Sequence, residues 1–218
     1  MISARRLIVL LVLASGCVHA KIPPLEQYRL RIPDTSITSL ALPDGDGHEV
    51  RPAGDLAIVP YLAPGLYGSR GIVFRIGESQ YGSYPNREWA VPVSTMLGMI
   101  TEDLLRSRPV TLGPAVFDPP SPHSYTYIWR GVVRELEEVD RASEVYAAVR
   151  LDARLVRARD DSIMWVGSAR LERRVPSGTM PAIVDALSRL TTEAILQLVD
   201  GARTTLAHPT VGAHNKKP

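Results

Sequence analysis

The sequence predicts an α/β domain in which a largely antiparallel sheet of about five to six strands packs against two main helices. One observation is the strict alternation of apolar and polar residues over 145–155 and again over 163–175, which indicates a long antiparallel hairpin. The other is a pair of segments, after Pro92 and after Pro181, in which apolar residues recur with the helical period of 3.6 residues. In both patterns one face of the strand or helix is apolar and suited to burial, and the other face is polar.

The remaining strands are expected upstream of this hairpin. Each shows either alternation or a short apolar run bounded by turn residues. The predicted segments are 28–32, 56–62, 72–76, a short strand within 79–84, and 127–139. The alternation slips near Gly131, which predicts a β-bulge there.

The two helices have recognisable ends. Pro92 suits the first turn of a helix, since no intrahelical hydrogen bond needs its missing N–H, and Pro109 prevents continuation. The last helix is expected to begin at Pro181 and to end before Gly201, because glycine favours the position that follows a helix. The proline-rich stretch 114–124 is expected to be a surface loop.

The N-terminus has the form of a secretory signal. Arg5 and Arg6 precede an apolar run over 7–14, and the small residues of 14–16 follow it. A transmembrane helix would need about 20 apolar residues. The run is shorter than that and is closed by Lys21 and two prolines, so cleavage and export are favoured.

Cys17, the only cysteine of the 218 residues, follows the small residues of this signal. The run Leu-Ala-Ser-Gly-Cys resembles the lipobox of bacterial lipoproteins, although Ala14 stands where that motif usually has leucine. We therefore expect acylation of Cys17 and anchoring through several acyl chains. The lipoprotein resemblance implies sorting to the outer membrane, since the residue after the cysteine, Val18, is not aspartate. The alternative is an ordinary signal peptide with an incidental cysteine.

The predicted organisation is a signal peptide over 1–16, a lipid-anchored tether over 17–27, one domain over 28–201 and a disordered tail over 202–218. The full chain has a net charge of +2, and removal of the two signal arginines leaves the mature chain neutral. A neutral balance argues against a nucleic-acid partner. The body contains no cysteine, so its stability has to come from a packed core.

No catalytic or cofactor motif stands out. The histidines fall in the expected tether, loops and tail, whereas a metal site needs ligands held on rigid elements. Dinucleotide, P-loop and nucleophile-elbow motifs are missing. Glu135 and Glu137 are expected to share a face of their strand that points to solvent or to a partner. We therefore predict a protein without catalytic residues, cofactor or metal, not an enzyme.

Aromatic residues are the remaining candidates for contact. Trp89 and Trp165 are expected in the core, whereas Tyr67 lies in a glycine-rich loop over 64–70. Aromatic and arginine side chains are common anchors of protein interfaces. Tyr67 and Arg70 are therefore the predicted partner-binding residues, towards either another protein or further copies of the same chain arranged as a ring.

A set of ordered motifs carries a family resemblance. After the lipobox-like run come the Tyr-x-Leu strand at 28–30, Val-Pro-Tyr-Leu at 59–62, Ile-Val-Phe-Arg at 72–75 and Trp-Ala-x-Pro at 89–92, followed by the hairpin and the last helix. In this order they resemble the ABC-type transport auxiliary lipoproteins, the PqiC-like family, over roughly residues 28–199. The loop over 63–71 and the insert after Val116 are longer than in that family.

The resemblance implies a single α/β domain with a mixed sheet and packed helices. It also implies a role beside an MCE-domain protein, a permease and an ATPase that move lipids or other hydrophobic solutes between two membranes. The chain would then be an outer-membrane lipoprotein facing the periplasm and acting as a docking element. The alternatives are an envelope lipoprotein with a structural or assembly role and no transport partner, and a periplasmic hydrolase, for which no triad is evident.

Overall fold

The computed structural model describes residues 23–33 and 51–207. Within them the chain forms one eight-stranded sheet and two α-helices. The strands are β1 (Glu26–Tyr28), β2 (Leu56–Ile58), β3 (Gly71–Ile76), β4 (Gln80–Trp89), β5 (Ala115–Phe117), β6 (Tyr127–Arg141), β7 (Glu144–Arg157) and β8 (Ile163–Arg174). The helices are α3 (Val93–Ser107), α4 (Met180–Ala207) and the 3-10 turns η1 (Gly65–Gly68) and η2 (Pro122–Ser124).

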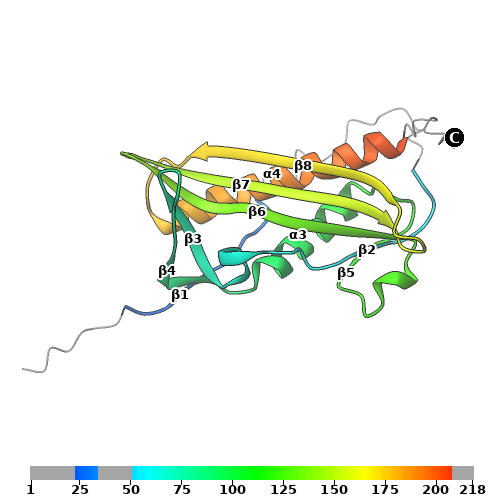
Figure 1. Ribbon diagram of the computed structural model, residues 1–218, viewed down its shortest axis with the longest axis horizontal. Helices are drawn as coiled ribbons and strands as arrows, with labels where there is room; N and C mark the ends of the chain where they lie inside the picture. The colour runs from blue at the N-terminus through cyan, green and yellow to red at the C-terminus, as the bar shows by residue number, and fades with distance from the viewer. Residues whose placement is uncertain (1–22, 34–50, 208–218) are drawn as a thin grey trace, which may run out of the picture.

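Strand β6 is the central strand of the sheet and pairs with three other strands. One of its edges pairs along its whole length with β7, and β7 pairs in turn with β8, both antiparallel. The other edge is shared by two parallel strands, with β2 beside the first half of β6 and β3 beside the second. Strand β5 extends the sheet beyond β2, and β4 and β1 extend it beyond β3. The sheet therefore forks on one side of β6 (Figure 1).

Both α-helices lie on the same face of the sheet (Figure 1). Helix α4 packs on β7 and β8, and α3 packs on β2, β5 and α4. Side chains of these helices and of the alternate strand residues form one large core. Among the described residues, no helix covers the opposite face of β6, β7 and β8 (Figure 1).

A stack of two indoles lies in this core. The rings of Trp129 on β6 and Trp165 on β8 are 5.5 Å apart. Trp129 donates its Nε1–H to the buried hydroxyl of Tyr61 at 3.1 Å. That hydroxyl lies 2.9 Å from Thr101 Oγ1, which donates to the carbonyl of Leu97. Indole can only donate and the carbonyl can only accept, so the chain of donors runs from Trp129 to helix α3.

The predicted fold class is confirmed: the chain is a single α/β domain with a mixed sheet and two main helices. The sheet has eight strands rather than five to six. Seven of the eight strands overlap the seven predicted segments, and the eighth, β5, lies within the expected loop over 114–124. The first strand, predicted over 28–32, is Glu26–Tyr28 and begins inside the expected tether. Such three-residue strands are too short to show a period in the sequence.

The predicted end of the last helix is wrong. Helix α4 passes through Gly201 and ends at Ala207, so residues 202–207 belong to the domain and not to the expected tail. A Cβ atom at residue 201 would lie 3.4 Å from the ring of Trp165. A side chain there would make an ordinary van der Waals contact, so Gly201 is an internal residue of α4 beside Trp165 of β8 and does not end the helix. The expected signal over 1–16 and the last residues, 208–218, lie outside the described part of the chain.

We expect Leu97→Ala to lower the free energy of unfolding by about 2–5 kcal/mol, because Leu97 is fully buried between α3 and the sheet. Chemical denaturation monitored by circular dichroism measures the change. Met99→Ala on the same helix is the control, since that side chain is 50% exposed. Equal losses from the two substitutions would contradict the assignment of the buried face.

Candidate functional site

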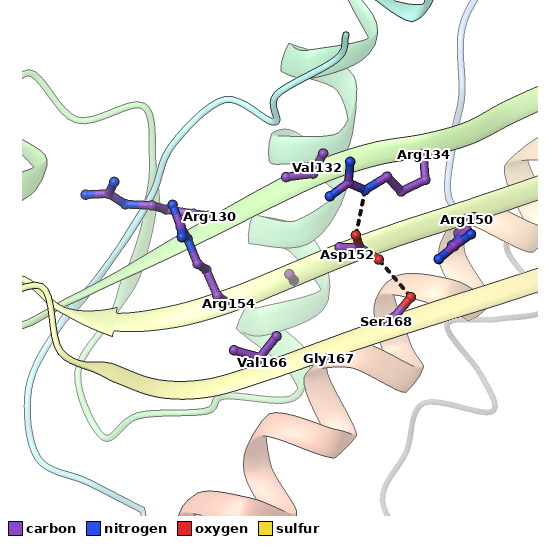
Figure 2. A pocket seen from close by; sticks show the side chains of 10 residues that line it. Arg130, Val132, Arg134, Arg150, Asp152, Arg154, Val166, Gly167 and Ser168 are labelled. Carbon is purple, nitrogen blue, oxygen red and sulfur yellow. Dashed lines mark hydrogen bonds and ion pairs between the residues drawn. The ribbon is translucent and has the colours of Figure 1, made fainter.

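The uncovered face of the sheet carries a cluster of arginines. Successive residues of a strand point to opposite faces, so the residues that alternate with the core positions of β6, β7 and β8 share this face. Seven arginines of the described residues lie on this face: Arg130, Arg134, Arg150, Arg154 and Arg170, with Arg141 and Arg174 towards the far end of the strands. A groove of about 580 Å³ lies among the first four of them, with Val132, Asp152, Val166 and Ser168 in its lining. We call it the arginine groove (Figure 2).

The strand register brings like charges together in this cluster. Arg130 on β6 is directly opposite Arg154 on β7, and Arg150 on β7 is directly opposite Arg170 on β8. Side chains that face each other across two strands lie about 5 Å apart at Cβ, and like charges in such pairs are destabilising. Glu135 on β6 is directly opposite Arg150 and ion-paired with Arg170, so the repulsion is left mainly in the Arg130–Arg154 pair, on a face that is open to solvent.

One carboxylate lies among the arginines of the groove. Asp152 accepts a hydrogen bond from Arg134 at 2.6 Å and another from Ser168 at 2.7 Å (Figure 2). Partial burial tends to raise the pKa of Asp152, but these two hydrogen bonds and the charges of Arg134 and Arg150 outweigh it and lower the pKa. Asp152 is therefore a carboxylate at neutral pH and neutralises one of the groove's cations.

The arginines differ in their partners. Arg130 lies 3.2 Å from Asp161, and Arg170 lies 3.5 Å from Glu135. Arg150 and Arg154 are exposed, and neither has an ion-pair partner among the described residues. The groove therefore keeps a positive charge after its internal ion pairs are formed.

A β-bulge supplies one of the arginines. The pairing of β6 with β7 shifts register between Val133 and Glu135, so that Arg134 is the additional residue. The sequence predicts this irregularity a few residues earlier, at Gly131. That glycine has a different role: a Cβ atom there would lie 2.1 Å from the ring of Tyr61. The missing side chain lets Tyr61 reach Trp129 in the core.

Tyr67, one of the two predicted contact residues, is tied to the sheet. Its hydroxyl donates to the carboxylate of Glu137, which also accepts from Arg75 at 2.7 Å. Burial, followed by the hydrogen bond to Glu137, raises the pKa of Tyr67. Glu137 is fully buried and not on a solvated face as expected, because Arg75 and Tyr67 cover it. The tyrosine thus fastens η1 to β6.

Arg70, the other predicted contact residue, lies close to the backbone of β4. Its guanidinium donates to the carbonyls of Trp89 at 3.1 Å and Ala90 at 2.7 Å, and it lies 3.5 Å from Glu88. Its side chain is nevertheless 47% exposed. The structure does not bring Tyr67 or Arg70 into the arginine groove, and their role in partner binding stays a prediction.

Two other predicted features fall partly or wholly outside the described residues. Cys17 lies in the undescribed N-terminal segment. Across residues 23–33 and 51–207, no three His, Cys, Asp or Glu side chains are grouped as metal ligands would be. In the same segments no helix combines the length and the apolar content needed to cross a bilayer.

The sequence pattern does not predict the arginine groove. The polar positions of the strand over 145–155 include Arg150 and Arg154, and the alternation indicates only that they share the polar side of that strand. The signal that could have found them is the repetition of arginine at polar positions in three successive strands. Only the register shows that these arginines are neighbours.

Comparison with known proteins supports the fold. The sequence matches no family model and no curated protein. A crystal structure of a Xanthomonas campestris protein described by the family model DUF330 has a TM-score of 0.64 and 18% identity, over 82% of this chain and 95% of that one. A second, uncharacterized protein has a TM-score of 0.59 and 12% identity, over 82% of this chain and 98% of that one. At these identities the likeness shows a shared fold.

We expect Tyr67→Phe to destabilise the protein by about 1–3 kcal/mol, because it leaves a buried carboxylate oxygen of Glu137 without its donor. Thermal or urea unfolding measures the change. Tyr146→Phe is the matched control, since its hydroxyl also donates to a glutamate, Glu144, but at the surface. A loss for Tyr67→Phe no larger than that for the control would show that the buried hydrogen bond adds no stability.

Proposed function

We propose that this protein is a lipid-anchored envelope lipoprotein that faces the periplasm from the outer membrane. In this proposal it is an auxiliary component of an ABC/MCE-type system that transports lipids or other hydrophobic solutes. It acts as a docking element and performs no catalysis. Its partners are an MCE-domain protein, a permease and an ATPase, with further copies of the chain as a possible ring.

The observation that carries this proposal is the agreement between the expected and the observed fold. The resemblance to transport auxiliary lipoproteins implies a mixed sheet packed by helices, and the chain has that fold. A protein described as DUF330 shares the fold over 82% of this chain. The lipobox-like run before Cys17 independently supports an anchored envelope protein.

The geometry suits a docking role. A tethered domain without catalytic residues has to act through contact, and arginine is enriched at protein interfaces. The glycine-rich loop that carries Tyr67 and Arg70 is fastened to the sheet by the hydrogen bond of Tyr67 to Glu137. The loop therefore offers a protein partner a well-held set of contacts.

We expect Cys17→Ala to release the protein from the outer membrane, as a soluble or an uncleaved periplasmic form, because the acylated thiol is lost. Membrane fractionation and intact mass measure the outcome. Ser15→Ala is the control, since it keeps a small residue before the cysteine and should leave the anchor in place. A Cys17→Ala protein that stays in the outer membrane at unchanged mass contradicts the lipoprotein assignment.

The transport association needs a separate test. Affinity purification of the anchored protein after mild crosslinking should recover the MCE-domain protein, with the permease and ATPase in the same assembly. Genes for these components beside its own would support the same conclusion. Recovery of the anchored protein without any of them would favour the structural or assembly lipoprotein.

A further inference from the structure

We propose that the arginine groove binds the phosphate headgroup of an anionic phospholipid, with Arg130 and Arg154 holding the phosphate and Val132 and Val166 contacting the first carbons of the acyl chains. This adds direct lipid contact to the docking function. The lipid proposal is argued from the groove alone. Failure of the lipid test and failure to recover the transport partners are therefore separate outcomes.

The place at which the phosphate binds is indicated by guanidinium donors that have no acceptor within the described part of the chain. Arg154 is exposed and without an ion-pair partner among the described residues, and the strand register places it directly opposite Arg130. The guanidinium of Arg130 contacts Asp161 through Nη2, and its Nη1 donates to no acceptor among the described residues. Two neighbouring guanidinium groups with free donors match the several acceptor oxygens of a phosphate. A bound anion would also relieve the repulsion between them.

The acyl-chain position follows from the next residues of the same strands. Val132 lies two residues beyond Arg130 on the same face of β6, and Val166 on β8 is directly opposite Arg154. Val166 is 63% exposed and lies on β8, the edge strand on this side of the described sheet. Figure 2 shows both valines in the same groove as the arginines. Cations beside exposed aliphatic carbons are complementary to an anionic amphiphile.

The size of the groove favours such a ligand over an acidic protein segment. Its volume of about 580 Å³ lies within the range of small-molecule sites. A stable protein interface needs about 800 Å² from each partner, which is a wider and flatter surface. Asp152, Val132 and Ser168 interrupt the arginines of the face, whereas an acidic partner would be matched better by an unbroken basic surface.

Asp152 has a defined part in this site. Its carboxylate holds Arg134 at 2.6 Å, so that this arginine is engaged and not available to the ligand. The carboxylate also lies in the row next to the Arg130–Arg154 pair, where it repels an incoming phosphate. Neutralising it should therefore strengthen anion binding, while neutralising Arg154 should weaken it. Opposite effects from two neighbouring substitutions are hard to obtain from general changes in stability.

The test is native mass spectrometry of the intact protein in an uncharged detergent. The ligands are palmitoyl-oleoyl phosphatidylglycerol, the zwitterionic phosphatidylcholine with the same chains, and glycerol 3-phosphate as the free headgroup. We expect one phosphatidylglycerol per chain, bound more tightly than either of the others. Arg154→Gln should weaken this binding by at least about tenfold, and Asp152→Asn should tighten it. Val166→Thr should weaken lipid binding without changing that of glycerol 3-phosphate.

Arg29→Gln is the matched control, since Arg29 is also exposed and without an ion-pair partner in the described part of the chain but lies outside the groove. Equal binding by the Arg154→Gln and Arg29→Gln proteins would overturn the proposal. Glycerol 3-phosphate bound as tightly as the lipid would assign the groove to free phosphates instead. A glutamate-rich peptide that binds through Arg154 when phosphatidylglycerol does not would assign it to an acidic protein. Circular dichroism confirms that each variant is folded.

Discussion

The pairing of β6 with three other strands is the constraint on which the domain depends. Its one edge is covered by β7 throughout, and its other edge is divided between β2 and β3. Because these partners come from both halves of the chain, β6 joins the N-terminal strands to the C-terminal hairpin. The isolated pairing of Leu62 with Val132 lies between the two partners. A slip of β6 by one residue would exchange its core and surface faces.

Buried polar groups reinforce this arrangement on both faces of β6. Glu137 is held by Arg75 from β3 and by Tyr67 from η1, which orders the loop before β3. Trp129, on the same strand, is linked through Tyr61 to helix α3. Each buried polar group is costly without its partner and so selects one arrangement of the elements around it. These contacts tie η1, β3 and helix α3 to the central strand of the sheet.

The positions of the arginines on the sheet depend on the packing of the core. The core on the helix side fixes the register of β6, β7 and β8, and the register places Arg130 opposite Arg154 and Arg150 opposite Arg170. The repulsion in these pairs is small beside the burial of Leu151 and Leu155 on the other side of β7. The fold can therefore maintain a cationic groove. Asp152, the carboxylate among the described residues that line it, is already paired with Arg134, so the other arginines stay available to a ligand.

The sequence by itself determined the features that depend on local pattern: the hairpin over 145–175, helix α3 and the start of helix α4. A period of two or of 3.6 residues reports which face is buried but not what lies beside it. The division of one edge of β6 between β2 and β3, the burial of Glu137 and the passage of α4 through Gly201 were decided by tertiary contacts. The arginine groove belongs with these, since residues from three strands become neighbours only when packing of the core sets their register.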